Sequence, residues 1–379
     1  MTLKVLSIFG TRPEAIKMAP VVRELQNRPE IDSYVCVTAQ HREMLDQVLD
    51  LFHLTPDYDL NLMRPGQTLT GLAARVMVEL DSLLRHLQPD WVLVQGDTTT
   101  VMASALAARH LKIRVGHVEA GLRTGDMLNP FPEEMNRVVT DAISDLHFAP
   151  TPLARDNLRR AGIPDASITI TGNTVIDALL EIAGRPWSPG EDHPLYRWSN
   201  GSAPPRRLIM VTAHRRENFG RPLENICAAL REIAERGRDD LHLIYPVHLN
   251  PNVQEPVYRL LGDVPNISLL PPLDYLSLVQ LMKRSTLILT DSGGIQEEAP
   301  GLGVPVLVLR RVTERQEGVE AGTVRLVGTD TETIVAETFR LLTNPAAYRA
   351  MAQAVNPYGD GHAARRIVDR LLQEVAVAG

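Results

Sequence analysis

The fold is decided by the stretch WVLVQGDTTTVMASALAARHLKIRVGHVEAGLRTGDMLNPFPEEMNR (residues 91–137). Trp91–Gln95 and Ile113–Val118 are short, mostly apolar runs of the kind that form buried parallel strands. Between them, Thr98–Leu111 carries its apolar residues at helical spacing. The stretch therefore predicts a β-α-β unit, with a polar loop at the carboxyl end of each strand.

Three carboxylates occupy these loops and the segment that follows them. Asp97 comes after the first strand, Glu119 comes after the second, and Glu133 lies where a helix is expected to begin with Pro132 at its first position. Loops at strand carboxyl ends line the ligand crevice of an open α/β sheet, so we expect all three carboxylates to face one place. Clustered carboxylates repel one another. At least one should therefore have a raised pKa and serve as an acid or base near neutral pH.

Each of these carboxylates also has a purely structural interpretation. Asp97 precedes Thr98 and Thr99, and it fits the N-cap of the next helix. Glu133 at a helix start would interact favourably with the helix dipole and need do nothing more. Convergence of three carboxylates from successive loops favours a chemical role, but it names no reaction.

Length and composition limit the class of protein. The 379-residue chain is long enough for about two domains, and its formal charge of −7 argues against nucleic acid or an anionic membrane as a partner. Cys36 and Cys227 are expected to be inert buried thiols, because their spacing fits neither a disulfide framework nor a zinc site. No signal peptide and no membrane-spanning run are expected, which predicts a cytoplasmic protein.

Towards the N-terminus, Leu3–Phe9 predicts a strand that leads through Gly10 into a helix. Arg12 stands where it and the helix N-terminus can bind a phosphate together, although a surface salt bridge explains it equally well. Neither GxGxxG nor GxxxxGK[ST] occurs here, so neither a dinucleotide fold nor a P-loop is indicated.

The second half of the chain contains its strongest anion-binding pattern. Ser292, Gly293 and Gly294 lie between a predicted strand and helix, where exposed N–H groups and the helix dipole attract anions. Glu298, about one turn further, is placed to accept from ribose hydroxyls; the alternative is an exposed helical glutamate. His214 follows another strand beside two arginines, and the alternative for it is a structural hydrogen-bond partner.

Strands and helices alternate in both halves of the chain. This predicts an α/β fold with two doubly wound parallel sheets and a ligand cleft between them. Gly184–Arg206 is rich in Pro, Gly and Ser, and it is the expected boundary or surface insertion. From the residues alone we infer a two-domain protein that binds a phosphorylated ligand and brings carboxylates to face a His/Arg loop.

A resemblance to one family runs through nearly the whole chain. It rests on GTRPEAIKMAPVV (10–22), TAQHREMLD (38–46), GDTTT (96–100), GHVEAGLRT (116–124), PFPEEMNR (130–137), TGNTVIDAL (171–179), TAHRREN (212–218), PVHLNP (246–251), LTDSGGIQEEAP (289–300), TERQEGVEAGT (313–323) and NPYGDG (356–361). In this order the segments resemble the bacterial, non-hydrolysing UDP-N-acetylglucosamine 2-epimerases. So many long motifs in sequence order make chance similarity implausible.

The departures from the family pattern are few. Gln95 stands where the family usually has His, and Gln316 stands where it usually has Pro. The segment 184–206 is longer and more irregular than the usual linker. None of these changes removes a residue to which the family assigns chemistry.

The resemblance implies a glycosyltransferase-B-like fold of two Rossmann-like domains. They would comprise residues 1–171 with 360–379, and residues 172–359, with the last helix crossing back to the N-terminal domain. A homodimer is also implied, with no metal, no nicotinamide and no other cofactor. The implied reaction interconverts UDP-N-acetylglucosamine and UDP-N-acetylmannosamine for cell-surface polysaccharide synthesis. It proceeds by elimination of UDP, a 2-acetamidoglucal intermediate and re-addition.

By the same resemblance, the site residues fall into three sets. The acid/base set is Asp97, Glu119 and Glu133, with His214 meeting the leaving diphosphate. Contacts to UDP are implied for Arg12, Ser292, Gly293, Gly294 and Glu298, with Lys17 as a supporting charge near Asp97. A second UDP-N-acetylglucosamine, acting as an activator, would contact Gln40, Glu43, Arg215 and His248. Activation is expected to need more ligand here, because Gly66 replaces a basic residue of some members and Glu43 replaces their Gln.

Three other functions remain open at this point. A hydrolysing epimerase would release UDP and free N-acetylmannosamine. A retaining glycosyltransferase of similar fold would share the ribose contact of Glu298, but it would need an acceptor groove and would not need three carboxylates near the sugar. A non-catalytic nucleotide-sugar sensor would keep the binding loops and is expected to lose the carboxylates, which this chain retains.

Overall fold

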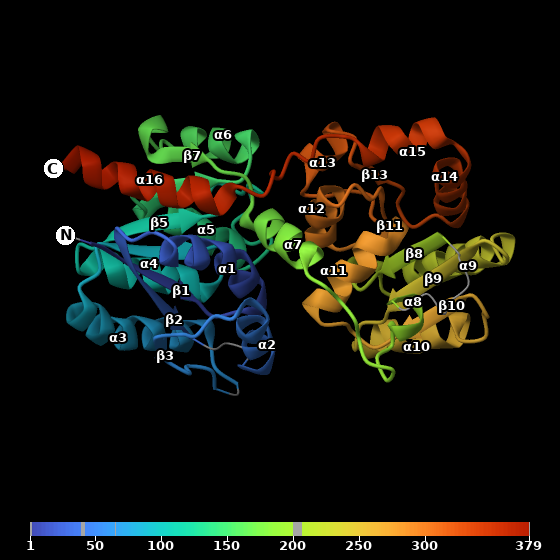
Figure 1. Cartoon of the computed structure of the whole chain (residues 1–379), viewed down its shortest axis with the longest axis horizontal. Helices are drawn as coiled ribbons and strands as arrows, with labels where there is room; N and C mark the ends of the chain where they lie inside the picture. The colour runs from blue at the N-terminus through green and yellow to red at the C-terminus, as the bar shows by residue number, and fades with distance from the viewer. Residues whose placement is uncertain (1, 39–41, 65, 200–206, 379) are drawn as a thin grey trace. The chain divides into compact units, whose positions relative to one another are not determined.

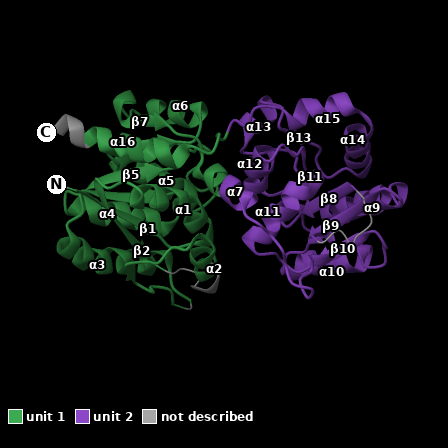
Figure 2. Cartoon of the chain, viewed as in Figure 1, with its two compact units in different colours: residues 1–178, 358–379 green, residues 179–357 purple. Residues whose placement is uncertain are grey.

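The computed structural model describes residues 2–38, 42–64, 66–199 and 207–378 (Figure 1). The chain divides into two compact units, which we call unit 1 (residues 1–178 and 358–379) and unit 2 (residues 179–357) (Figure 2). The chain thus leaves unit 1 after Ala178 and returns to it at Tyr358. No helix in the described part of the chain is both long and apolar enough to cross a membrane.

Unit 1 is built on a parallel sheet whose described strands run in the order β3-β2-β1-β4-β5-β6-β7. The strands are β1 (Leu3–Phe9), β2 (Ile31–Val37), β3 (Tyr58–Asp59), β4 (Trp91–Gln95), β5 (Arg114–Val118), β6 (Leu146–Ala149) and β7 (Ile168–Ile170). Every residue of β4 and nearly every residue of β1 is buried. Burial on both faces is what a parallel sheet covered by helices requires, and it explains why these strands are continuous apolar runs.

Threonine side chains start many of the helices of unit 1. The helices are α1 (Arg12–Gln26), α2 (Arg42–Phe52), α3 (Leu69–Leu87), α4 (Thr99–His110), α5 (Glu133–Ile143), α6 (Pro152–Arg160), α7 (Thr174–Gly184), which continues into unit 2, and α16 (Ala363–Ala378). Before α1, α3, α4 and α6, a threonine hydroxyl accepts a backbone N–H of the first turn. Asp177 accepts from the N–H groups of Ala363 and Ala364 at 3.2 and 2.9 Å, and so caps α16 from the segment that precedes unit 2.

Unit 2 repeats the architecture with a second parallel sheet, ordered β10-β9-β8-β11-β12-β13 among the described strands. The strands are β8 (Arg207–Thr212), β9 (Leu241–Pro246), β10 (Ile267–Leu270), β11 (Ser285–Thr290), β12 (Val306–Val308) and β13 (Val324–Leu326). The helices are α8 (Tyr196–Ser199), α9 (Arg221–Arg236), α10 (Pro251–Leu261), α11 (Tyr275–Arg284), α12 (Gly293–Gly301), α13 (Gln316–Glu320), α14 (Thr331–Thr343) and α15 (Pro345–Ala352). The prediction of two doubly wound parallel sheets is confirmed.

Each sheet has one point at which the strand order reverses: between β1 and β4 in unit 1, and between β8 and β11 in unit 2. The loops that follow the two central strands diverge at such a point, and ligands of open α/β sheets bind in the crevice there. In unit 1 the loops begin at Gly10 and Gly96; in unit 2 they begin at Ala213 and Asp291. The fold therefore places the loops of Arg12, Asp97, His214 and Ser292 at the switch points, whereas the Glu119 loop follows the next strand, β5.

The structure corrects the sequence interpretation in small ways. The edge strands β3 and β13 were not predicted, because two- and three-residue strands carry too little alternation to be recognised. Pro132 is the N-cap of α5 and not its first residue, since the helix begins at Glu133. In the expected boundary at 184–206, the short helix α8 occupies Tyr196–Ser199, and residues 200–206 lie outside the described residues.

Candidate active site

Helix α1 begins at the switch point of unit 1, directly after β1. Thr11 and Glu14 form a capping box: the Thr11 hydroxyl accepts from Glu14 N–H at 3.4 Å, and Glu14 Oε2 accepts from Thr11 N–H at 2.9 Å. Glu14 Oε2 also accepts from Gly10 N–H at 2.7 Å. A side chain at Gly10 would collide with Thr38, since a Cβ there would lie 2.1 Å from its hydroxyl oxygen. These contacts fix the start of the helix that carries Arg12 and Lys17.

Asp97 follows β4 on the other side of the switch point. Its N-cap interpretation is wrong, because Thr98 caps α4 by accepting from Val101 N–H. The Asp97 carboxylate instead accepts from Arg137 at 2.5 Å, and Asn136 donates to the Asp97 carbonyl at 2.9 Å. Both partners belong to α5, so that helix holds the backbone and the side chain of Asp97.

Glu119 is the most constrained of the three predicted carboxylates. Its φ of 68° lies in the left-handed region, which a residue with a long side chain rarely adopts. Lys17 donates to its Oε1 and Oε2 at 2.8 and 2.6 Å, and the Gln95 amide also donates to Oε2. The residue is 8% exposed. A buried acceptor with two side-chain donors and a strained backbone is the arrangement expected of a group held in place for function.

Glu133 and Arg12 differ from the other predicted residues of unit 1. Glu133 is the first residue of α5 and Arg12 is the first residue of α1, and both are partly exposed. Neither side chain has a hydrogen bond or ion pair with a described residue. Each is thus available at a helix start: Glu133 as an acid or base, and Arg12 as a donor to an anion.

Sequence reasoning missed Glu14. It expected a carboxyl group with a raised pKa at this site, and Glu14 is such a group. Burial, the largest cause, raises the pKa of Glu14, and the charge of Asp97 raises it further, against hydrogen bonds from Gly10 and Thr11 that lower it. A carboxyl group with a raised pKa therefore does lie near Asp97, but it is in the helix cap. The T-x-x-E pattern of 11–14 was the available signal.

In unit 2, the fully buried Asp291 organises the loop that carries His214. Its carboxylate accepts from the N–H groups of His214 and Arg215 and from the Asn218 amide, at 2.9, 2.8 and 2.9 Å for Oδ2. Sequence reasoning did not single out Asp291, because a residue between a strand and a glycine-rich turn gives no sign of contacts about seventy positions away. Through these hydrogen bonds, Asp291 joins the two loops of the switch point.

His214 is a partly buried imidazole with a second imidazole against it. Its ring stacks on that of His248, with centroids 5.3 Å apart and planes 15° from parallel. Burial, the largest cause, lowers the pKa of His214, as do His248 and Arg215, while Asp291 opposes the shift. A bound anion would raise that pKa, so the ring is suited to gain charge as an anion develops beside it.

The predicted anion loop lies at the N-terminus of α12, as expected from its glycines. Ser292 is the N-cap, and its side chain makes no capping bond to the helix. A side chain at Gly293 would fit tightly, since a Cβ would lie 3.3 Å from atoms of Arg215, Arg315 and Glu314. Two guanidinium groups therefore stand beside the helix N-terminus, both paired with Glu314, and each can donate to a diphosphate.

Glu298 is buried and not an exposed helical residue. It lies within α12, is 8% exposed, and accepts a hydrogen bond from the Tyr275 hydroxyl at 2.9 Å. A Cβ added to Gly294 would lie 3.4 Å from its Oε1, so the glycine turn and the carboxylate are adjacent. The exposed alternative considered from the sequence is thus wrong.

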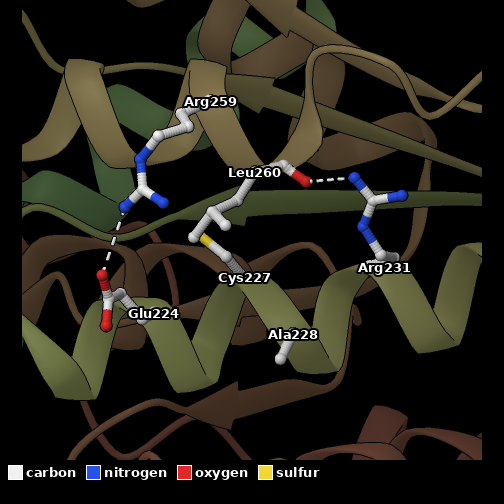
Figure 3. A pocket seen from close by; sticks show the side chains of 6 residues that line it. All are labelled: Glu224, Cys227, Ala228, Arg231, Arg259 and Leu260. Carbon is white, nitrogen blue, oxygen red and sulfur yellow. Dashed lines mark hydrogen bonds and ion pairs between the residues drawn. The ribbon is translucent and has the colours of Figure 1, made fainter.

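Some features of the structure lie apart from these loops. Gln40 and the side chain of Glu43 lie outside the described residues. Figure 3 shows a surface hollow between α9 and α10, in which Arg259 pairs with Glu224 and Arg231 donates to the Leu260 carbonyl. None of the residues that line it belongs to the predicted site. Within the described ranges, no cluster of three or more His, Cys, Asp or Glu side chains is arranged to hold a metal ion.

Comparison with known proteins gives one consistent result. Residues 23–372 match the family described as UDP-N-acetylglucosamine 2-epimerase. The chain is 55% identical over 373 residues to the UDP-N-acetylglucosamine 2-epimerase of Salmonella typhimurium, covering 97% of this chain and 98% of that one.

Solved structures agree with the sequence comparison. The crystal structure of the Neisseria meningitidis UDP-GlcNAc 2-epimerase bound to UDP-GlcNAc is 48% identical, with a TM-score of 0.86 over 98% of this chain and 100% of that chain. A further crystal structure of a UDP-N-acetylglucosamine 2-epimerase is 52% identical, with a TM-score of 0.90 over 99% and 97% of the two chains. The expected glycosyltransferase-B-like fold class is confirmed by these likenesses and by the two parallel sheets.

Proposed function

The chain belongs to the UDP-N-acetylglucosamine 2-epimerase family, and from this premise we infer that it interconverts UDP-N-acetylglucosamine and UDP-N-acetylmannosamine. It is accordingly an isomerase, of the non-hydrolysing bacterial type. The inversion occurs at C2 of the sugar, which has no adjacent carbonyl group to make its proton acidic. The reaction must therefore create the acidity that the substrate lacks.

We propose that departure of UDP creates it. As the C1–O bond breaks, C1 gains positive character, which acidifies the C2 proton, and its removal leaves 2-acetamidoglucal and UDP. Re-addition of UDP at C1, with a proton delivered to the opposite face of C2, gives the epimer. Two faces require two proton-transfer groups, and the leaving diphosphate requires cations and N–H donors.

The carboxylates of unit 1 are proposed to move the protons. Glu119 and Asp97 are oriented by fixed donors, Lys17 with Gln95 for the first and Arg137 for the second. Glu133 has no partner among the described residues and begins the same helix that orients Asp97. Lys17 would act on the substrate through Glu119, whose charge it balances.

The loops of unit 2 are proposed to bind UDP. The N–H groups of Gly293 and Gly294, the Ser292 hydroxyl and the neighbouring arginines would bind the diphosphate, and Glu298 would accept from the ribose. His214 would become charged as the diphosphate leaves, because the anion raises its pKa. Arg12, which has no partner within the described ranges, would add a further donor from unit 1.

One observation carries the proposal of proton transfer beyond family membership: Glu119 has a left-handed backbone conformation, and two side-chain donors hold its carboxylate. Binding of a sugar nucleotide does not by itself require a strained carboxylate. A proton abstracted from a weak carbon acid needs a base fixed within hydrogen-bond reach.

The test is epimerisation of UDP-N-acetylglucosamine in heavy water, followed by proton NMR. The product should be UDP-N-acetylmannosamine that carries deuterium at C2, because the proton that leaves is not the one that arrives. Release of UDP with free N-acetylmannosamine would identify a hydrolysing enzyme instead. Retention of the original C2 proton over many turnovers would contradict elimination and re-addition.

The assembly and regulation implied by the family belong to the same proposal. We propose a cytoplasmic homodimer whose product serves polysaccharide precursor synthesis. A second UDP-N-acetylglucosamine molecule is proposed as an activator, with Arg215 and His248 among its contacts, because Arg215 follows His214 in the same loop and the His248 ring stacks on that of His214. Gln40 and Glu43 are the proposed contacts from the other unit.

A further inference from the structure

His117 is a fully buried histidine that no step of the proposed reaction uses. It lies in β5, two residues before Glu119, and both of its ring nitrogens have acceptors. Nδ1 is 2.6 Å from Asp141 Oδ1, and Nε2 is 2.7 Å from the carbonyl oxygen of Gly96. Gly96 is the residue that precedes Asp97. One imidazole therefore contacts the residue before Asp97 and lies two residues before Glu119, and it bonds to neither carboxylate.

Asp141 is the other half of the pair and lies near the end of α5. It is 1% exposed, and its second oxygen accepts from Gly121 N–H at 3.2 Å and from Arg123 at 2.7 Å. Gly121 lies two residues after Glu119, at a φ of 88°. A Cβ there would lie 2.3 Å from the Ala154 carbonyl oxygen, so the backbone at this point is confined against α6.

We propose that His117 and Asp141 form a positioning pair, which joins the Gly96–Asp97 loop and the Glu119–Gly121 loop to helix α5. That helix also carries Glu133 and supplies the two groups that hold Asp97. The pair thus determines where three carboxylates stand relative to one another without touching the substrate. This inference depends on the proposed epimerase reaction for its activity measurement.

The chemistry of the contacts fixes the protonation of the pair. A backbone carbonyl only accepts, so Nε2 must donate to Gly96, and a carboxylate at 2.6 Å from Nδ1 requires a second donated proton. Burial by itself lowers the pKa of His117, but the charge of Asp141 and the two hydrogen bonds raise it above its ordinary value. Burial raises the pKa of Asp141, and His117 with Arg123 lowers it to below the ordinary value.

An imidazolium paired with a carboxylate makes hydrogen bonds of fixed direction, whereas an apolar side chain at this position would only pack against its neighbours. The neutral form would point a lone pair at the carboxylate or at the carbonyl, and either contact would then be lost. Loss of the link lets the Gly96 carbonyl and the Gly121 N–H move independently of α5. A shift of about 1 Å in a reacting group is enough to slow a reaction about a hundredfold.

The experiment compares His117→Gln, Asp141→Asn and the double variant with a matched control, His147→Gln. His147 is also buried and contacts Asp141, but its Nε2 bonds to the backbone carbonyl of Asp141, at 2.8 Å, and not to the carboxylate. Its ring bonds to neither the Gly96–Asp97 loop nor the Glu119–Gly121 loop. Each variant is assayed for kcat and for UDP affinity by calorimetry, at a temperature well below its melting point. The parent enzyme is labelled with ¹⁵N-histidine to count the ring protons of His117 by NMR.

We expect kcat to fall about 10- to 100-fold in both single variants, with UDP affinity within about twofold of the parent. The double variant should lose no more than the worse single variant, because the two residues act as one unit. His147→Gln should melt earlier but keep kcat within about twofold. NMR should show two ring protons on His117 at pH 6, below the ordinary pKa of histidine.

Three results would overturn the inference. Unchanged kcat in a folded His117→Gln enzyme would show a structural role only, as would an equal loss of kcat in His147→Gln. A single ring proton on His117 at pH 6 in the parent would contradict the pair, even if no variant folds. An inactive parent, by contrast, would count against the proposed function and leave the NMR result to decide the pairing.

Discussion

At the scale of single residues, Asp97, Glu119 and Glu133 are positioned by different means. Arg137 orients the first, Lys17 and Gln95 orient the second, and the third begins a helix. We expect Asp97→Asn, Glu119→Gln and Glu133→Gln each to lower kcat by about 10²–10⁴, the range of acid/base groups. Steady-state assays with UDP affinity as the control measure this. A triple variant with near-normal activity would remove all three from the mechanism.

The buried pair His117 and Asp141 should also shape the dependence of stability on pH. The lowered pKa of Asp141 contributes stability above its ordinary value of 3.8, which is lost as pH falls through the folded value. The raised pKa of His117 contributes stability below 6.5, which is lost as pH rises through the folded value. The full contribution therefore lies between pH 3.8 and 6.5.

Asp141→Asn tests this dependence. It should cost about 3–5 kcal/mol within the window, because it leaves buried cations without their partner. The loss should shrink towards both ends of the pH range. Melting temperatures measured from pH 4 to 9 check it, and a loss that is equal at every pH would contradict the linkage.

At the scale of elements, helix α12 and its first glycine should control UDP binding. Gly293→Ala would bring a Cβ within 3.3 Å of Arg215, Arg315 and Glu314, so these side chains must move away from the helix N-terminus. We expect UDP to bind about tenfold more weakly, which corresponds to about 1.4 kcal/mol. Gly190→Ala is the control in the same unit, because its Cβ would meet nothing within 4 Å. Equal UDP affinity in both variants, measured by calorimetry, would speak against an anion site at α12.

Helix α1 offers a second test, through Glu14. The raised pKa of this buried carboxyl group means that its contribution to stability is greatest below 4.5 and is lost as pH rises through the folded value. Glu14→Gln keeps an acceptor oxygen for Gly10 and Thr11 without the charge, so its stability relative to the parent should improve from pH 5 to pH 8. Glu14→Ala should lose about 1–2 kcal/mol, as other broken caps do. Chemical denaturation at both pH values measures the difference, and a Gln variant that falls behind at pH 8 would refute it.

At the scale of the whole molecule, activation by a second substrate molecule should appear in the time course. Supplied with UDP-N-acetylmannosamine alone, the enzyme should show a lag that traces of UDP-N-acetylglucosamine abolish. An activator needs only to bind the active conformation of the enzyme better than the inactive one, because that difference in affinity shifts the population towards the active conformation. His248→Ala should lose this response and exposed His86→Ala should keep it. Immediate full-rate turnover in the parent would argue that no activator site exists.

Sequence patterns recovered the larger architecture because that architecture depends on local periodicity. Short, mostly apolar runs such as Leu3–Phe9 and Trp91–Gln95 are typical of buried parallel strands, and the helices between them followed from apolar spacing. The edge strand Tyr58–Asp59 escaped notice, because two residues carry no period. The positions of Asp97, Glu119 and His214 at strand ends were likewise readable from chain order alone.

Contacts between residues distant in the chain were decided only by the tertiary structure. Arg137 reaches Asp97, Lys17 reaches Glu119, and Asp291 reaches the His214 loop, across separations that no local pattern encodes. The same is true of pKa values: the sequence predicted a raised carboxyl pKa in the cluster, and burial raises the pKa of Glu14, a residue that the sequence analysis did not single out. The physical reason is that apolar periodicity acts over a few residues along the chain, whereas desolvation and charge pairing depend on distances that exist only once the strands have been brought side by side.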